Sequence, residues 1–562
     1  MSTVSSTSSS SSSTTTTSTS TDYTDFNTSD LVEAKLSSRY TRLDSLNTEV
    51  SDNETKIAAY QDMQDKLQAV TDTLAKLRGD TSSTGKASDV FRDRTTYLSS
   101  SNSSTASTYM SASVDEGTEM GSHAITISQV AKTNIVSTTA QSSKTDDLGW
   151  SGAITLGTDS GSSASINITA TMSLADIADA INNEKSTSGV QASVMKVSDS
   201  KYQLILTSTE TGRTITAKDT SGSVLSGNLG LIDSSGAVIS GMVLQDAQSA
   251  KFTVDGVTIT RTSNDIDDVL DGVTLHLYSA PSSDTTLTLE VDNDLSAIKT
   301  AITDFVTAYN SFRDFVVTNQ STASDGTANS DATLFGDSTL RSVAQSVQTI
   351  LSSAVDQQSL ALLGITFDTD NKLEVDETTL DNMLQDNLDA VQSLFSYTMT
   401  SSSGDLGLVR YPSKDMSFTI DVTVDANGAL SGASIGGDSS MFTVSNGTIK
   451  GVEGTDYEGL TMVYTGTTAK SITVKLSQGI ADQLYTAMDA VSNADTGSLA
   501  DVIKSLQSSN DDLDSRISSL EDSISSYKTS LTTLYANMAA KISTASNTAD
   551  LLKALLNANS NN

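Results

Sequence analysis

Two acidic clusters are the places where the 562-residue sequence comes nearest to a metal-binding pattern. Residues 368–372, Asp-Thr-Asp-Asn-Lys, alternate oxygen ligands as the start of an EF-hand calcium loop does. Lys372 stands where a third ligand is required and the glycine of such a loop is missing, so we predict a turn. A second cluster could bind calcium through Asp265, Asp267, Asp268 and Asp271. Because the chain carries 69 acidic residues, we favour an acidic turn there as well.

Catalytic side chains are scarce. The chain has no Cys and only two His, His123 and His276, which lie far apart in the sequence. It contains no Walker loop, no dinucleotide-binding glycine fingerprint after a strand and no nucleophile elbow. The single Trp, Trp150, is interpreted as a packing residue. We therefore expect no enzyme activity, no catalytic residues, no cofactor and no metal site.

The charge balance restricts the partners. Lys and Arg number 33 against 69 Asp and Glu, which gives a formal net charge of −36. Such a surface repels phosphate, so we expect no binding to nucleic acid or to anionic lipid. No apolar run approaches the roughly 18 residues that a membrane-spanning helix needs, and we expect no membrane insertion. With no Cys and two Pro, the chain largely avoids disulfide exchange and X-Pro isomerisation, which suits folding after export.

The N-terminus is a Ser/Thr tract, because residues 2–21 are Ser or Thr at every position except Val4. A tract without apolar side chains cannot form a core, so we predict disorder. It also lacks the basic and apolar regions of a Sec signal peptide. Export by a route that reads a disordered N-terminus and retention in the cytoplasm with a flexible tail both fit this feature.

Heptad spacing predicts a long helix near each end of the chain. The first covers residues 31–77, and Gly79 is placed to end it. Its apolar positions Ile57, Tyr60 and Met63 follow one another at two successive spacings of three. The apolar stripe should therefore overwind or change its partner there.

The second helix begins at Ser498, and its apolar stripe continues to Met538 with spacings that alternate four and three. Asn510 stands within this stripe. A polar residue at such a position costs stability and can fix the register of a coiled coil, while the alternative is a helix that frays or bends there. Two such helices at opposite ends of one chain pair most simply with each other, so everything between them is an outward insertion.

A short apolar stripe lies near the C-terminus, at Leu551, Leu552, Leu555 and Leu556. It is too short to be stable as a separate helix. It either packs back on the coiled coil or docks on a partner, and the polar, Asn-rich sequence around it favours a partner.

Residues 90–292 are predicted to be rich in β-strands, because apolar and polar side chains alternate with a period of two. Asp255-Gly256 and Asp271-Gly272 are turn signals between these strands. One short helix is expected at 174–182, with Ser173 as its N-cap.

Helical spacing returns after residue 292 and predicts helices at 295–316, 340–350 and 379–395. Between the last two, the segment ITFDTDNKLEV at 365–375 predicts a hairpin in which Asn371 adopts the left-handed conformation. Residues 405–476 alternate again and are predicted to be β-rich.

These patterns give an α+β fold: a helical coiled-coil leg built from both chain ends and central helices, with inserted β-rich head domains. The predicted order is a disordered Ser/Thr-rich tail at 1–28, an N-terminal coiled-coil helix at 29–89, a β-rich head region of two domains at 90–292, a helical leg block with a hairpin at 293–400, an additional β-rich insertion at 401–477, a C-terminal coiled-coil helix at 478–545 and a terminal contact segment at 546–562.

Several segments resemble one known family. SDLVEAKLSSRYTRLDSL at 29–46 is similar to its N-terminal helical region, and the heptad helix at 512–538 to its C-terminal coiled coil. AKFTVDGVTITRTSN at 250–264 is more specific, and LGITFDTDNKLEVDETTL at 363–380 is the most specific. In this order along nearly the whole chain, the motifs resemble the bacterial flagellar filament cap family, also called flagellar hook-associated protein 2. The chain departs from that family in its Ser/Thr tract and in Asn371, where the hairpin often carries Gly.

The resemblance implies export in an unfolded state, without a Sec signal peptide, through the flagellar type III channel to the distal tip of the flagellum outside the cell. There the family forms a homo-oligomeric ring that guides the folding and insertion of exported flagellin, without catalysis. Flagellin, hook-filament junction proteins and an export chaperone are the implied partners. Carried to this sequence, the implied partner contacts are Leu31, Val32, Leu551, Leu552, Leu555 and Leu556.

Other functions stay open from the sequence. Another axial flagellar protein, at the hook-filament junction or a flagellin, also has terminal heptad helices and β insertions, and the motif at 363–380 separates the cap family from it. A surface adhesin that binds glycans through its β domains is the second alternative, and cell adhesion is compatible with capping. An enzyme would need a carboxylate site without Cys, and no such site is evident.

Overall fold

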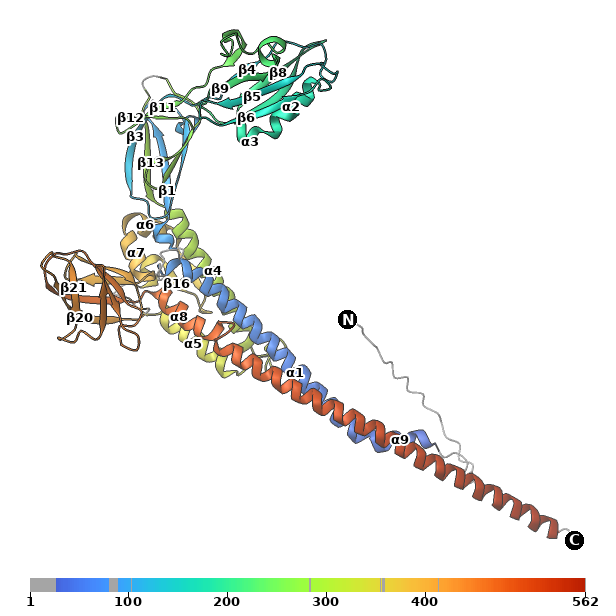
Figure 1. Ribbon diagram of the computed structural model, residues 1–562. Helices are drawn as coiled ribbons and strands as arrows, with labels where there is room; N and C mark the ends of the chain where they lie inside the picture. Colours follow the sequence, from blue (N-terminus) through green and yellow to red (C-terminus); the bar gives the residue numbers. More distant parts are fainter. Residues whose placement is uncertain are drawn as a thin grey trace.

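The computed structural model describes residues 27–79, 89–102, 104–282, 285–353, 355, 359–412 and 414–560. They form a long helical stalk with β-rich bodies at and near its upper end (Figure 1). Helices and antiparallel sheets both contribute, so the α+β prediction is confirmed. The Ser/Thr tract at 2–21 lies outside the described residues.

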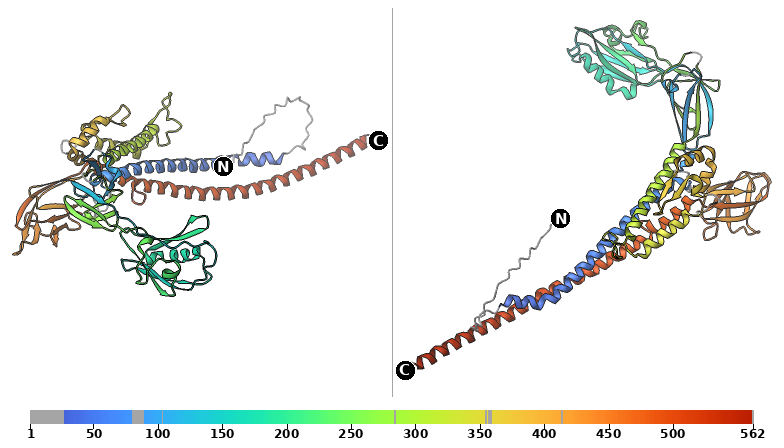
Figure 2. Two further views of the ribbon diagram at one scale, coloured as in Figure 1. Left: turned by 90° about the horizontal axis from the view of Figure 1, so that it is seen from above. Right: turned by 180° about the vertical axis from the view of Figure 1, so that it is seen from behind.

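The stalk pairs the first and last helices of the chain, α1 (Thr28–Leu77) and α9 (Ser498–Ser560), side by side (Figures 1 and 2). The helices run in opposite directions, because Arg39 lies beside Ser523 while Asn53 lies beside Asn510. The predicted pairing of the chain ends is confirmed. The buried side chains of the lower seam are Val32, Leu36, Ile524 and Leu531.

The upper part of α1 leaves this seam and enters a helical leg block. The block contains α4 (Leu295–Gln320), α5 (Ser338–Leu351), the 3₁₀ turn η5 (Leu360–Leu363), β16 (Ile365–Phe367), β17 (Leu373–Val375), α6 (Glu377–Asp386), α7 (Leu388–Phe395) and α8 (Ile480–Ser492). From Tyr60 and Met63 onward, α1 packs against α4 and α8. The phase shift in the apolar stripe therefore marks a change of partner, which is one of the two predicted outcomes.

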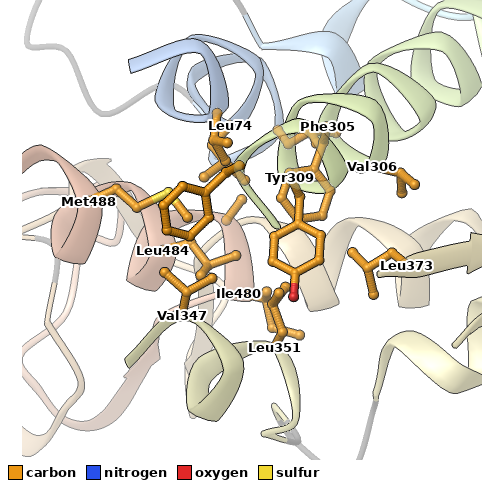
Figure 3. Close-up of a cluster of buried hydrophobic side chains, with 14 of the residues drawn as sticks. Leu74, Phe305, Val306, Tyr309, Val347, Leu351, Leu373, Ile480, Leu484 and Met488 are labelled. Atoms are coloured by element: carbon orange, nitrogen blue, oxygen red, sulfur yellow. The ribbon is translucent and has the colours of Figure 1, made fainter. Parts of the chain in front are cut away.

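The largest core of the described chain lies in this block. Figure 3 shows Leu74 of α1, Phe305 and Tyr309 of α4, and Leu484 and Met488 of α8 converging on one centre. Each of these side chains is at most 2% exposed. Burial of so much apolar surface is the main force that holds the five helices α1, α4, α5, α8 and α9 together at this level.

Side-chain caps fix where the inner helices begin. Asp294 Oδ1 accepts a hydrogen bond from Ala297 N at 2.9 Å, and Asp337 Oδ1 accepts one from Leu340 N at 2.8 Å. In α2 (Leu174–Asn183), Ser173 and Asp176 form the predicted cap as a reciprocal capping box. Each such cap satisfies a backbone N–H that the helix itself cannot pair.

The prediction of a single helix at 379–395 is wrong, because this segment forms two helices, α6 and α7. Asn387, with φ −144° and ψ 43°, separates α6 from α7. Asn competes for helical hydrogen bonds with its own side chain and favours such breaks. The buried positions Leu380, Leu384 and Val391 keep helical spacing across the break, so the pattern alone could not show it.

The β-rich body nearest the leg block is a sandwich of two antiparallel sheets. Phe252 and Leu289 are among the fully buried residues of its core. Its elements are η1 (Val90–Arg92), β1 (Arg94–Ser100), η2 (Ala106–Thr108), β2 (Met110–Val114), β3 (Gly121–Gln129), β11 (Ala250–Val254), β12 (Val257–Arg261), β13 (Asp265–Leu270), β14 (Val273–Leu277) and β15 (Leu287–Asn293).

A second body is inserted between β3 and β11 and has a core of its own. Trp150 packs against that core, as predicted. Its elements are β4 (Ile135–Ser137), β5 (Gly152–Thr158), β6 (Ser163–Ile168), α2, α3 (Lys185–Ser188), β7 (Val190–Ser198), β8 (Lys201–Ser208), β9 (Ile215–Ser221), η3 (Val224–Asn228), η4 (Ser240–Met242) and β10 (Val243–Gln245).

A third β-rich body projects from the side of the leg block, between α7 and α8 (Figure 1). It pairs two four-stranded antiparallel sheets. Its strands are β18 (Thr398–Ser401), β19 (Leu406–Arg410), β20 (Met416–Val424), β21 (Leu430–Ser434), β22 (Phe442–Ser445), β23 (Thr448–Gly451), β24 (Thr461–Tyr464) and β25 (Lys470–Ser477).

The turn Asp255-Gly256 joins β11 to β12 with positive φ at both residues, as the sequence predicted. Asp255 Oδ2 lies 2.8 Å from His123 Nδ1, and its Oδ1 accepts a hydrogen bond from Ala124 N at 2.9 Å. The hydrogen bond from His123, followed by that from Ala124, lowers the pKa of Asp255 below its ordinary value of 3.8.

We expect Asp255→Asn to reduce the acid sensitivity of this sandwich. A carboxyl with a lowered pKa stabilises the fold above the unfolded-state value near pH 4, and this contribution is lost as the pH falls through the lowered pKa. Asn tolerates the positive φ of 51°. Hydrogen exchange in peptides of β3 and β11 between pH 7 and pH 2 measures the effect. Asp267→Asn is the control, and equal acid sensitivity of the Asp255 variant and the wild type would contradict the prediction.

Candidate partner-binding site

The last turns of α9 present the four C-terminal leucines to solvent. Because the helices are antiparallel, α9 passes the start of α1 near Tyr535 and continues for about 25 residues, or roughly 37 Å. The predicted short stripe is therefore part of α9 and does not pack back on the stalk within the described chain. Leu551, Leu552, Leu555 and Leu556 are 56% to 65% exposed.

Two of these leucines, Leu552 and Leu556, are one helical turn apart and line a shallow hollow with Leu555 and Ala558. Side chains at such spacing form a continuous apolar stripe on one side of a helix. Binding of such a stripe to an apolar groove or helix face of a partner is favourable, because it removes apolar surface from water.

The two N-terminal candidates occupy different environments. Leu31 is 37% exposed, whereas Val32 is 4% exposed and belongs to the seam with α9. Judged from the antiparallel register, Leu31 lies roughly 28 Å along the stalk from Leu551. The structure therefore does not bring Leu31 and the C-terminal leucines together on one copy, and Val32 holds the stalk itself.

Asn510 faces a second asparagine across the stalk. Asn53 Nδ2 donates a hydrogen bond to Asn510 Oδ1 at 2.9 Å, and both side chains are partly buried. Helix α9 continues through this position without a break. A single paired polar layer between apolar layers is the arrangement that favours one register over a shifted one. We propose that the Asn53–Asn510 pair fixes the register of the stalk.

Replacing both asparagines, Asn53→Leu with Asn510→Leu, should raise the melting temperature of the stalk and broaden the distribution of assembly states. Asn510→Leu alone should raise the melting temperature less, because it leaves the Asn53 amide without its partner, at a cost of about 1–3 kcal/mol. Circular dichroism and mass photometry measure the two effects. Gln507→Leu, at an exposed position of α9, is the control; an unchanged distribution in the double variant would reject the register role.

The two acidic clusters have different structures in the described part of the chain. Asp368 Oδ1 accepts hydrogen bonds from Asp370 N and Lys372 N, both at 2.8 Å, so this carboxylate closes a turn as predicted. The second cluster lies mainly on strand β13, so the predicted turn is wrong for Asp265, Asp267 and Asp268. No group of three potential ligands was found among the residues that the structure describes.

Helix α4 clamps the hairpin formed by β16 and β17. Asn310 pairs with both backbone groups of Leu373, at 2.9 Å and 2.8 Å, and Tyr309 Oη donates to the carbonyl of Asn371 at 2.7 Å. Burial raises the pKa of Tyr309 to about 12. The predicted hairpin is confirmed, and Asn371 has a φ of 58°. This motif therefore packs one side of the hairpin into the leg core.

Two clusters of charged side chains were not predicted from the sequence. Arg78 Nη2 lies 2.6 Å from Asp482 Oδ1 inside the leg block. Arg39, Arg42 and Arg516 line a groove of the stalk. The available signals were an acidic residue among the apolar positions of α8 and two arginines spaced three apart on α1. Neither signal says which distant segment lies opposite.

The fold and its exposed surfaces indicate a class of protein. A stalk built from both ends of the chain, with β bodies at one end and an exposed leucine stripe at the other, is the architecture of a structural protein. No described helix has the length and apolarity to cross a membrane.

The chain belongs to the flagellar hook-associated protein 2 family. Its residues 247–547 match the profile of that family's C-terminus, and residues 24–134 match that of its N-terminus. Residues 153–210 match the flagellin hook IN motif. The resemblance stated from the sequence is thereby confirmed.

Individual flagellar proteins are similar to parts of this chain. The chain is 28% identical over 264 residues to the A-type flagellar hook-associated protein 2 of Pseudomonas aeruginosa, covering 44% of this chain and 53% of that one. It is 35% identical over 236 residues to the flagellar hook-associated protein 2 of Escherichia coli K12, covering 40% of this chain and 49% of that one. It thus spans about half the length of the curated relatives it matches. The crystal structure of the Escherichia coli flagellar cap protein FliD, domains D1-D2-D3, is similar at 29% identity, with a TM-score of 0.46, and covers 60% of this chain and 90% of that one.

Proposed function

We propose that the protein caps the flagellar filament at its distal tip, outside the cell. It assembles into a homo-oligomeric ring and guides the folding and insertion of exported flagellin subunits during filament elongation. The observation that carries this proposal is the exposed leucine stripe at the free end of α9, on the far side of the stalk from the β bodies. Membership of the flagellar hook-associated protein 2 family supports it.

The leucine stripe is the proposed contact with flagellin, with a hook-filament junction protein or, before export, with a chaperone. Leu31 is a second, smaller exposed contact on the same stalk. The chain contributes positions and surfaces to this process, with no chemical step of its own.

Deletion of the gene in its source bacterium tests the proposal. We expect loss of filaments by electron microscopy, loss of motility, and monomeric flagellin in the medium by immunoblot, all restored by the full-length gene. Normal filaments in the deletion strain, with no second cap gene present, would contradict the proposal. In that case, a glycan-binding assay with the full chain would test the adhesin alternative.

A further inference from the structure

A groove where α1 and α9 meet gathers three arginines in a strongly acidic chain. Arg39, Arg42 and Arg516 line it together with Leu46, Leu520 and two serines. Arg39 is held in place, because its Nη1 donates to Ser523 Oγ at 2.8 Å and its guanidinium lies 4.5 Å from the ring centroid of Tyr527.

None of these three guanidiniums is ion-paired with a carboxylate in the described part of the chain. This is unexpected in a protein with 69 acidic and 33 basic side chains. Like charges grouped on one helix surface repel each other and cost stability. Asp512 lies one helical turn from Arg516 and offsets part of this charge. The rest forms a positive surface that an external group of negative charge would neutralise.

The opposite flank of the stalk carries the complementary charge at the same height. At about 100° per residue, Asp44 lies about 200° from Arg42 around α1, and Asp514 lies about 200° from Arg516 around α9. Glu521 follows Asp514 by one heptad and shares its side of the helix. In the described chain, none of these three carboxylates takes part in an ion pair.

Both flanks have defined limits along the stalk. Glu49 and Asp512 lie on the arginine side and end the positive stretch toward the leg block. Lys528 follows Glu521 by one heptad and ends the negative stretch toward the free end. The positive and negative stretches therefore cover nearly the same length of stalk on opposite sides.

We propose that the arginine groove of one copy binds the acidic flank of the neighbouring copy, so that stalks pack side by side in the assembled ring. Two different, complementary patches on one molecule make a head-to-tail contact, which closes into a ring when the rotation fits. Because the patches lie at the same height, no shift along the stalk accumulates from copy to copy. This inference rests on the proposed assembly into a ring and names the surfaces that form it.

Charge reversal with rescue tests the contact in the full-length protein. One variant reverses the groove, Arg42→Glu with Arg516→Glu, and another reverses the acidic flank, Asp514→Lys with Glu521→Lys. Each should raise the concentration of half-assembly by about tenfold, measured by mass photometry and sedimentation. A chain with all four substitutions has complementary flanks again and should assemble nearly as well as the wild type. Arg39 is left intact because it contacts α9.

Controls separate this contact from other effects. Lys196→Glu with Lys201→Glu changes the net charge as the groove variant does, but on the β7–β8 hairpin, and should leave assembly unchanged. Circular dichroism should show the same melting for all stalk variants. Reversed variants that assemble like the wild type, or a fourfold variant that assembles no better than either pair, would overturn the proposed contact. A wild-type chain that stays monomeric at all concentrations would instead overturn the ring itself, and this contact with it.

Discussion

Filaments should be lost when Leu552 and Leu556 are both replaced by glutamate, although the protein stays folded. The two side chains are 56% and 63% exposed, so their replacement removes no core contact. Docking of each leucine on a partner is worth about 1.5–3 kcal/mol, and an introduced charge opposes docking further. Loss of both should weaken the contact by a factor of at least about 100.

The measurement is complementation of the deletion strain, with filaments counted by electron microscopy and flagellin in the medium measured by immunoblot. Ser543→Glu with Asn547→Glu is the matched control, because it adds the same charge at the same spacing on the opposite side of α9. Immunoblotting of the variant in the medium and in the cells separates two kinds of partner. A variant that is exported but does not cap indicates a filament contact. A variant that stays in the cell indicates a chaperone contact. Normal filaments with the leucine variant would contradict the role of the stripe.

Local chemistry explains which parts of the fold were predictable. The capping box of Ser173 and Asp176 and the turn at Asp255-Gly256 depend on side chains within a few residues of each other, and both were predicted. The heptad repeats also predicted the pairing of the two long helices, since two long apolar stripes in one chain can pack against each other. The change of partner near Tyr60 was visible as a phase shift, although the new partners were not.

Contacts between distant segments were not predictable in the same way. At Asn387 the helix breaks, although the buried apolar side chains keep helical spacing on both sides of the break. The position of the break therefore depends on tertiary packing and not on the apolar pattern. Val32 belongs to the stalk seam, yet the family resemblance placed it among the partner contacts. The groove formed by Arg42 and Arg516 joins positions from opposite ends of the chain, and no local sequence rule brings these together.

The second large effect is expected at the buried ion pair of Arg78 and Asp482. Asp482 is fully buried in the first turn of α8, and its Oδ1 lies 2.6 Å from Arg78 Nη2. Gln478 Nε2 donates to its other oxygen at 2.9 Å, and the guanidinium lies 4.0 Å from the ring centroid of Tyr485. This cluster joins the end of α1 to the start of α8, where the chain returns from the third β body.

Asp482→Asn should destabilise the leg block by about 3–5 kcal/mol, because it removes the carboxylate that compensates a nearly buried guanidinium. Urea unfolding of the full chain, followed by hydrogen exchange in peptides of α8, measures the loss. Asp314→Asn, which breaks the exposed pair with Lys372, is the control and should cost less than about 1 kcal/mol. Replacing both partners, Arg78→Met with Asp482→Leu, should recover much of the stability, since an apolar pair avoids the cost of desolvating charges. A single Asp482 variant as stable as the control would show that the pair is not what fixes α1 to α8.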